Sequence, residues 1–226
     1  MREVLFDLST EYEQMLHQGI RLSGENQEFF IRGRIESLRS RLPSGFKPRR
    51  ILDFGCGIGM TTHHLAERFE GAELLGVDTS ERAIQYGAGR YGSARVRFRK
   101  LEELTDENDF DLCHVSGVFH HIDPAERAGA MAAIHRVLRA GGFLSLFENN
   151  PWNPGTRMVM SRIPFDRDAK TLSPHQAKRL VRSTGFSGLI QWSMFYFPRP
   201  LAFLRFSEPA LSYLPLGAQY CVLAAK

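Results

Sequence analysis

Apolar and polar residues follow two different periods along most of this chain. Short apolar runs alternate with longer segments whose apolar positions recur every three to four residues, a pattern typical of buried strands and amphipathic helices. Strands are predicted at 50–54, 73–77, 96–100, 110–116, 143–147, 188–192 and 219–225. Helices are predicted near 60–69, 81–91, 123–139 and 173–185, and residues 151–172 are expected to form an irregular connection.

Two of the predicted helices carry recognisable motifs at their ends. Asp123 and Glu126 flank Pro124 as a capping box, and the glycine pair at 141–142 predicts that this helix stops near residue 139. Ser173 and Gln176 form a second capping box, before the helix expected to end near residue 185.

Strands and helices that alternate in this way predict an α/β protein with a doubly wound, mostly parallel sheet of seven strands and an antiparallel last strand. The carboxyl ends of the parallel strands would then share one edge, where ligands bind. Residues 1–48 show only helical patterning, at 10–20 and 27–42, before a Pro- and Gly-containing break at 43–48. We therefore expect a single domain over residues 1–226, beginning with a helical cap.

The turn after the first predicted strand carries the strongest candidate chemistry. Gly55, Gly57 and Gly59 alternate there, directly beyond Asp53 and before a predicted helix. Such glycines let a ligand lie against bare backbone at a helix N-terminus. The dinucleotide fingerprint would need a glycine where Met60 stands, and the Asp53 carboxylate would repel a pyrophosphate but suit a cationic ligand. An ordinary strand-to-helix turn is the alternative.

Asp78 ends the second predicted strand, 19 residues after Gly59. In nucleotide-binding α/β proteins, an acidic residue at about this distance accepts hydrogen bonds from ribose hydroxyls. The alternative is a capping role for the next helix, which Thr79 or Ser80 could also fill. Together with the glycine turn, Asp78 favours ribose binding.

These motifs resemble those of the class I S-adenosylmethionine (SAM)-dependent methyltransferases, in particular the small-molecule branch that includes quinone-biosynthesis methyltransferases. The resemblance covers residues 49–226. Within this range, the segments 110–122, 136–143 and 183–186 also match the family. It implies a Rossmann-like fold, SAM as the cofactor and methyl transfer to a small-molecule acceptor. Residues 49–150 would bind the cofactor, and residues 151–226 would face the acceptor.

The resemblance also implies individual roles at the cofactor. Asp53 would help to hold the ammonium group of the SAM methionine, and the backbone around Ser116 would lie beside that end. Lys100 stands where the family often has an acidic residue for the adenine, so Glu102 would substitute or Leu101 would pack on the ring. The implied cofactor-binding residues are Asp53, Gly55, Cys56, Gly57, Asp78, Thr79, Leu101, Glu102 and Ser116.

His120 and His121 follow the fourth predicted strand, beside the expected position of the reacting methyl group. A hydroxyl or amine acceptor must lose a proton, and histidine titrates near neutral pH. One of the pair is therefore a candidate general base, which slightly favours O-methylation, and a structural histidine is the alternative. Because no carboxylate stands at ligand spacing from these histidines, no metal site is expected.

Two further segments are candidates for the acceptor side. The connection after the fifth predicted strand is expected to overhang the methyl group, with Asn149, Asn150, Trp152 and Arg157 as acceptor contacts or as loop-stabilising residues. Residues 194–214 are rich in aromatic residues and prolines. They are expected to pack beneath the cap, or else to form an apolar acceptor channel or a membrane-facing edge for an apolar or lipid-linked acceptor.

Charge and composition limit the kinds of binding partner that we expect. The net charge is only +4, and Arg95, Arg97 and Arg99 lack interleaved aromatic residues that stack on bases, so no nucleic-acid partner is expected. No apolar run approaches the roughly 18 residues of a membrane span, which leaves peripheral membrane contact. The three cysteines show no metal-ligand spacing and are expected to be reduced thiols of a cytoplasmic protein.

Two other functions are compatible with parts of the pattern. A SAM-binding protein that does not transfer methyl groups, such as an interaction module or a non-redox catalyst, would keep the same glycine turn and Asp78. A nicotinamide-dependent dehydrogenase is disfavoured by Met60 and Asp53.

Overall fold

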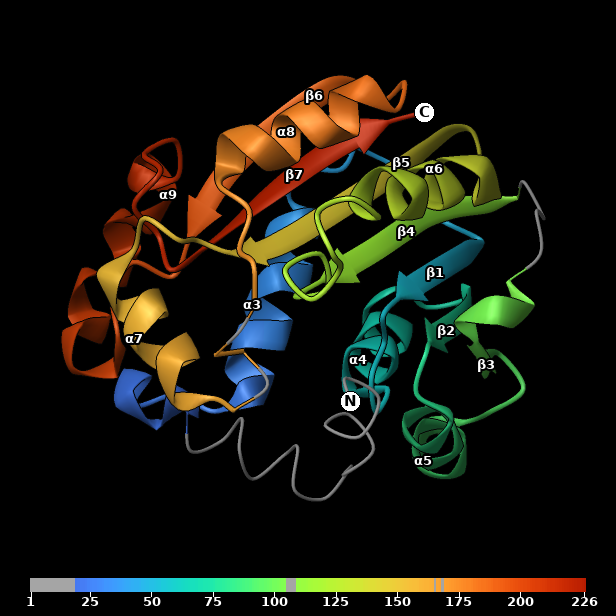
Figure 1. The fold of residues 1–226 in the computed structure, drawn as a ribbon, viewed down its shortest axis with the longest axis horizontal. Helices are drawn as coiled ribbons and strands as arrows, with labels where there is room; N and C mark the ends of the chain where they lie inside the picture. The colour runs from blue at the N-terminus through green and yellow to red at the C-terminus, as the bar shows by residue number, and fades with distance from the viewer. Residues whose placement is uncertain (1–18, 105–108, 165, 168) are drawn as a thin grey trace.

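The structure, a computed structural model, describes residues 19–104, 109–164, 166–167 and 169–226 (Figure 1). Its sheet has the strand order β3-β2-β1-β4-β5-β7-β6. Neighbours from β3 to β5 are parallel, whereas β7 is antiparallel to both β5 and β6. The predicted seven-stranded α/β sheet is therefore confirmed. The strands are β1 (Arg50–Phe54), β2 (Glu73–Asp78), β3 (Val96–Lys100), β4 (Phe110–Ser116), β5 (Leu138–Asn149), β6 (Ser187–Met194) and β7 (Gln219–Ala225).

Helices cover the sheet, and two apolar cores form between them and the strands (Figure 1). One core includes Met131 of α6 (Arg127–Val137) and Val181 of α8 (Pro174–Ser183). The other includes residues of α3 (Gln27–Arg39) and α4 (Met60–Arg68). The central strand β4 is buried at every position before Ser116, which is why its sequence shows no exposed alternation.

The chain order opens a crevice at the carboxyl ends of β1 and β4. From β1 the chain adds β2 and β3 on one side, and it then returns to add β4 and β5 on the other. The connections leaving β1 and β4 therefore diverge, which creates the space where α/β proteins bind ligands. α5 (Glu81–Tyr91) and the 3-10 helix η2 (Leu101–Glu103) border this space beside β2 and β3.

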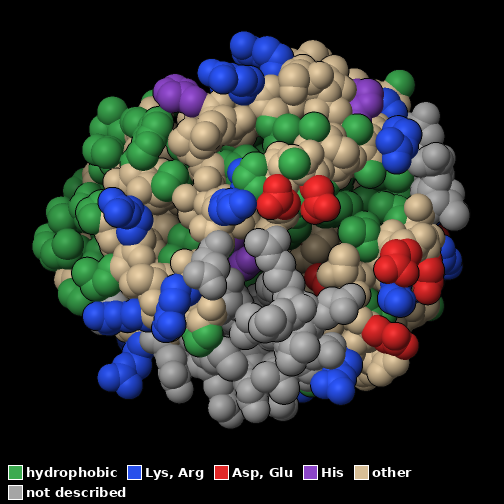
Figure 2. All heavy atoms as spheres, viewed as in Figure 1, with side chains coloured by type: hydrophobic (Ala, Val, Ile, Leu, Met, Phe, Trp, Pro, Cys, Tyr) green, Lys and Arg blue, Asp and Glu red, His purple; other side chains and the backbone are tan. Residues whose placement is uncertain are grey.

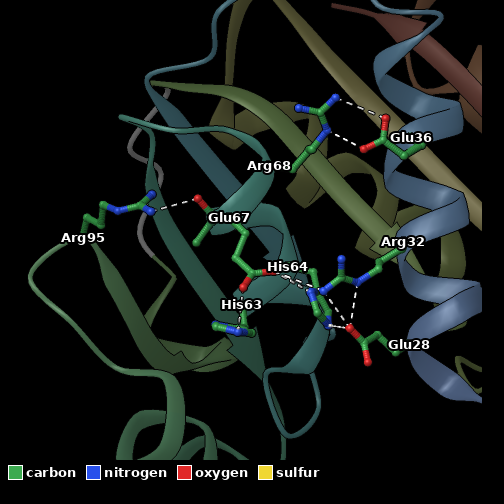
Figure 3. A network of polar contacts seen from close by, with 9 residues as sticks. Glu28, Arg32, Glu36, His63, His64, Glu67, Arg68 and Arg95 are labelled. Carbon is green, nitrogen blue, oxygen red and sulfur yellow. Dashed lines mark hydrogen bonds and ion pairs between the residues drawn. The ribbon is translucent and has the colours of Figure 1, made fainter.

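The described part of the helical cap is attached to both α4 and the sheet. Figure 3 shows a polar network between α3 and α4 in which Glu36 pairs with Arg68. On the sheet side, the Trp192 indole donates to the Ser37 hydroxyl at 2.9 Å. Most of the helix expected at 10–20 lies outside the described residues.

One predicted capping box was wrong. The Asp123 carboxylate accepts a hydrogen bond from the backbone N–H of Ala125 at 3.0 Å and closes a turn, so α6 begins four residues later than predicted. α6 also ends before residue 139, because Leu138 already pairs with Phe110 at the start of β5. The second capping box is confirmed, since Ser173 and Gln176 exchange both reciprocal bonds at the start of α8.

The connection predicted to be irregular contains a helix, α7 (Pro154–Arg162). The Asn153 side chain accepts from the backbone N–H of Thr156 at 2.9 Å, and a proline stands in the first turn, as in many helix starts. No helix within the described residues combines the length and apolar character that crossing a bilayer requires. The remaining short helices are η1 (Arg21–Ser23), η3 (Arg199–Ser207) and α9 (Glu208–Leu211).

Candidate active site

A cavity of about 1460 Å³ opens at the carboxyl ends of β1, β2 and β4. One part is lined by the glycine turn and the ends of these strands, and the other by α3, α7 and the connection between β6 and β7. Its volume exceeds the roughly 300–1,000 Å³ of an ordinary ligand pocket. The cavity therefore has room for a cofactor and a second molecule.

The glycine turn is closely packed on one side and open on the other. Gly55, Gly57 and Gly59 have φ angles of 74°, 53° and 86°, which residues with side chains rarely adopt. A Cβ at Gly55 would clash with Val118, and one at Gly59 would lie 2.7 Å from Phe98. A Cβ at Gly57 would meet no atom within 4 Å, and this residue lines the cavity. The turn thus fits a ligand that lies directly on its backbone.

Asp78 lines the cavity and also holds the glycine turn. Its Oδ2 accepts from the backbone N–H of Gly57 at 2.8 Å, and its Oδ1 accepts from the backbone N–H of Ser80 at 2.9 Å. Ser80, not Asp78, caps α5. A carboxylate has about four acceptor positions, so Asp78 can accept further bonds from ribose hydroxyls. Thr79, beside it, also lines the cavity.

Asp53 does not line the cavity, so the structure does not place it in direct contact with a ligand. Its carboxylate lies beneath the turn, is 2% exposed and accepts from the Thr62 hydroxyl at 2.6 Å. Burial raises the pKa of Asp53 to about 7, although the Thr62 bond and the charge of Arg34 act in the opposite direction.

Arg34 is a cavity residue that the sequence analysis missed. It lies on α3, is 9% exposed and donates to the Gln219 side chain at 3.1 Å, while Gln219 donates to Asn149 at 3.1 Å. All three residues line the cavity. The sequence did carry one signal for this role. Arg34 falls on the same face of α3 as the apolar residues Ile31 and Ile35, which are buried. A buried guanidinium at this position can bind a carboxylate.

Leu101, which the resemblance implies would pack on the adenine ring, lines the cavity. Cys56 of the turn and Ser116 at the end of β4 line it as well. The Glu102 side chain is 79% exposed and lies 3.7 Å from the Lys100 amine, outside the cavity. η2 turns Glu102 away, which corrects the expectation that it replaces the missing acidic residue.

His120 and His121 both line the cavity, together with two carboxylates from distant segments. His120 is 3% exposed, and its Nδ1 lies 2.6 Å from Oε2 of Glu148. Its Nε2 lies 3.4 Å from Oδ1 of Asp166, and Nε2 of His121 lies 3.2 Å from the same oxygen. Glu148 also accepts from the backbone N–H of Phe119 at 2.7 Å, which holds the histidine loop against β5.

Burial by itself would lower the pKa of His120. The charge of Glu148, together with the contacts to Asp166, outweighs this effect and raises the pKa of His120 to about 10. His120 therefore carries both ring protons at neutral pH and cannot take up another. His121 has a 22% exposed side chain, so it is the accessible member of the pair.

Folding brings the distant Asp166 carboxylate to these histidines, so the expectation that no carboxylate lies within ligand distance of them was wrong. The ligand atoms of His120, His121 and Asp166 lie within 4.8 Å of one another. A similar group on α4, formed by His63, His64 and Glu67, lies near the protein surface (Figure 3). The nitrogen of His120 that faces Asp166 carries a proton at neutral pH, which opposes metal binding there.

Only one of the four expected acceptor contacts, Asn149, lines the cavity. Asn150 is fully buried and donates to the carbonyls of Pro215 and Gly217 at 2.9 and 2.8 Å, which is a structural role. Trp152 is 44% exposed and packs against His175, and Arg157 lies on the solvent side of α7. The expectation failed because α7, not a loop, covers the cavity, through residues such as Thr156 and Met160.

The aromatic segment 194–214 divides into two parts. Phe195 packs edge-on against Phe30 at 4.9 Å and near Phe29 at 5.8 Å, and all three line the cavity. Phe195 has a φ of 61°, so its backbone is strained in a position that directs the ring at the cap. Beyond it, Phe203 and Phe206 are 69% and 84% exposed, so the segment as a whole is not buried beneath the cap.

Comparison with known proteins identifies the family. Residues 52–144 match the family model described as a methyltransferase domain. The chain is 34% identical over 190 residues to the ubiquinone biosynthesis O-methyltransferase of Alkalilimnicola ehrlichii, covering 78% of this chain and 69% of that protein. It is 32% identical over 126 residues to the demethylmenaquinone methyltransferase of Thermus thermophilus, covering 53% and 56% of the two chains.

The fold comparison agrees. A SAM-dependent methyltransferase from Archaeoglobus fulgidus superimposes with a TM-score of 0.66 at 18% identity, covering 92% of this chain and 97% of that one. The chain therefore belongs to the class I SAM-dependent methyltransferases, and the cofactor of this family is SAM. The chain spans about half or less of the length of several other curated relatives that it matches.

Proposed function

We propose that this chain transfers the methyl group of SAM to a hydroxyl group of a small apolar molecule. The observation that carries the proposal is a single cavity that joins the glycine turn and Asp78 to His121 and then to an aromatic wall. When bound, SAM supplies a methyl group on a positively charged sulfur. The task of the protein is to hold both molecules and remove the acceptor proton.

The cofactor side fits the chemical groups of SAM. The open backbone at Gly57 would lie against the methionine moiety, and the Asp78 carboxylate would accept from the ribose hydroxyls. Arg34 would pair with the methionine carboxylate, since it is a buried cation that lines the cavity and whose charge acts on Asp53 below the glycine turn. Asp53 would act on the ammonium group only indirectly, because it lies beneath the turn.

His121 would take up the acceptor proton. Asp166 lies beside its Nε2 and would stabilise the imidazolium that forms. His120 would act as a positioning residue, because its two ring nitrogens face Glu148 and Asp166. This arrangement supports O-methylation over methylation of an acceptor that needs no base.

The aromatic wall supports a planar, apolar acceptor such as a phenol or hydroquinone. Phe29, Phe30 and Phe195 contact one another where α3 and the β6–β7 connection line the cavity, and an aromatic ring can pack on them there. The names of the two quinone-biosynthesis relatives agree with this chemistry.

The arginines near β3 support a small molecule over a nucleic acid. The Arg95 guanidinium donates to the backbone carbonyls of Ala66 and Ala72 at 2.9 and 3.3 Å. Arg97 pairs with Glu73 at 3.4 Å. These contacts give both side chains partners within the fold rather than leaving them as a phosphate-binding row.

Methyl transfer from labelled SAM to a panel of phenols, catechols, hydroquinones and amines tests the proposal. We expect label on hydroxyl acceptors, and His121→Gln should lower kcat by about 10²–10⁴-fold with the affinity for S-adenosylhomocysteine unchanged. His63→Gln, on the surface of α4, is the matched control and should leave both quantities unchanged. Calorimetric binding of S-adenosylhomocysteine with no label in the panel or in lipid and aqueous extracts would instead indicate a SAM-binding protein without transferase activity.

A further inference from the structure

The segment between β6 and β7 exposes a group of large apolar side chains. Phe203, Phe206 and Tyr213 are 69%, 84% and 83% exposed, whereas aromatic side chains in folded proteins are mostly buried. Figure 2 shows hydrophobic side chains gathered at the left edge of the molecule, where Figure 1 shows α9 and its neighbours. We call this surface the aromatic edge, and it consists of Leu201, Phe203, Phe206, Tyr213, Leu214 and Leu216.

The aromatic edge is held in place by polar contacts on its inner side. The Glu208 carboxylate accepts from the backbone N–H groups of Tyr196 and Phe197, both at 3.1 Å. The Tyr196 hydroxyl lies 2.6 Å from the carbonyl of Leu211, and Arg205 pairs with Glu25 of the cap at 2.9 Å. The fold therefore fixes the backbone of this segment while its apolar side chains face outward.

The aromatic edge borders the mouth of the cavity. Met158 of α7 is 50% exposed and also lines the cavity, and Pro198, just before η3, is likewise exposed and lines it. Exposed parts of the cavity wall therefore lie on α7 and directly before η3, the helix that carries Phe203 and Phe206 of the aromatic edge. The lining there is apolar, with Val159 and Phe197.

Positive charge accompanies this apolar surface. Residues 151–226 contain ten lysines and arginines and three aspartates and glutamates, whereas the rest of the chain has more acidic than basic residues. Arg157 and Arg162 lie on the exposed side of α7, and Arg199 is exposed at the start of η3. Figure 2 shows Lys and Arg side chains beside the hydrophobic ones.

We propose that the aromatic edge docks on the surface of an anionic lipid bilayer and places the cavity mouth at that surface. Exposed aromatic side chains enter the interfacial region of a bilayer, and flanking arginines are attracted to anionic headgroups. An acceptor dissolved in the bilayer would reach the cavity between α7 and η3 without crossing water. The docking surface stands independently, whereas this entry route rests on the proposed methyl transfer.

Flotation of the whole protein with vesicles tests the docking, without SAM or acceptor. The vesicles contain phosphatidylcholine alone or with about 30% phosphatidylglycerol. We expect binding to the anionic vesicles that weakens as NaCl is raised. Phe203→Ser/Phe206→Ser should lower partitioning by about tenfold or more, because both rings are largely exposed and their loss does not disturb the core. Ile190→Ser, 46% exposed on β6, is the matched apolar control and should bind as the wild type.

The charge contribution has its own pair of variants. Arg157→Gln/Arg162→Gln should lower binding to anionic vesicles by about tenfold, whereas Arg90→Gln/Arg97→Gln, exposed on α5 and β3, should have little effect. Equal binding of the wild type and of Phe203→Ser/Phe206→Ser would overturn the proposal. So would a concentration-dependent dimer, seen by sedimentation, that the same substitutions abolish, because the edge would then be an interface between two copies. Loss of methyl transfer with vesicle binding intact would count only against the proposed function.

Discussion

Asp53 makes stability depend on pH in an unusual direction. Its pKa is about 7 in the fold, compared with an ordinary value of 3.8 for an aspartate side chain, so the folded state holds the proton more tightly than the unfolded chain. The contribution of this group to the free energy of unfolding is therefore present at low pH and is lost as pH rises towards 7, by up to roughly 1.4 kcal/mol per pH unit.

Asp53→Asn removes this dependence while keeping an acceptor for the Thr62 hydroxyl. We expect the free energy of unfolding of the variant, measured by urea denaturation, to rise relative to that of the wild type between about pH 4 and pH 7. Parallel pH profiles for the two proteins would show that Asp53 stays ionised in the fold.

Arg34 provides a second test at the level of one side chain. If its guanidinium binds the methionine carboxylate, Arg34→Met should weaken binding of S-adenosylhomocysteine by about tenfold or more, measured by calorimetry. Binding of adenosine, which lacks that carboxylate, should change little. Arg32→Met, on the exposed side of the same helix, is the control. Equal losses for both ligands would assign Arg34 a structural role only.

Individual site residues were predictable where the chemistry is local in sequence. Gly57 and Asp78 line the cavity as their spacing suggested, since a strand, a turn and a helix determine where they lie. Glu148 and Asp166 could not be assigned to His120 in this way, because 28 and 46 residues separate them along the chain and only folding brings them together. These two carboxylates, and not burial, are what raise the pKa of His120.

Among the elements, α7 is the one whose loss should affect the acceptor alone. Asn153 caps this helix, and its side-chain amide donates to the Leu216 carbonyl at 2.7 Å, which attaches α7 to the β6–β7 connection. Asn153→Ala should cost about 1 kcal/mol of stability and raise the KM for the acceptor, with SAM affinity unchanged.

Ser80→Ala is the matched control, because Ser80 caps α5 on the cofactor side. It should weaken SAM binding and leave the acceptor KM unchanged, as measured by initial rates at saturating concentrations of the other substrate. The same response from both variants would show that the two sides of the cavity are not supported separately.

The element boundaries that were predicted well are those determined by strong local patterns. β4 and β7 have the predicted bounds, because continuous burial makes their runs apolar. α7 was missed because its inner face meets a cavity rather than the core, so only Thr156 and Met160 are buried and its apolar period is weak. Asp123 failed as a cap because a tight turn competed for the same carboxylate.

At the scale of the whole molecule, the reaction should need no metal ion. The protonated imidazole of His120 lies between Glu148 and Asp166, where a metal would otherwise have to bind. Treatment with a chelator should leave the rate of methyl transfer unchanged, and added Mg²⁺, Mn²⁺ or Zn²⁺ should not raise it. Loss of activity that one of these ions restores would show that the histidine–Asp166 group binds a metal.

The sequence by itself determined the α/β sheet, because strand and helix patterns alternate along the chain, and it determined the glycine turn and the cofactor class, because their motifs each lie within a short segment. The order of the strands, with β7 between β5 and β6, was given by the tertiary structure. Only the tertiary structure decided which histidine is accessible, that Arg34 enters the cavity, and which aromatic residues of 194–214 face the cavity or the solvent. These properties depend on contacts between α3, α7 and the β6–β7 connection, and no local pattern records how segments so far apart in the chain pack together.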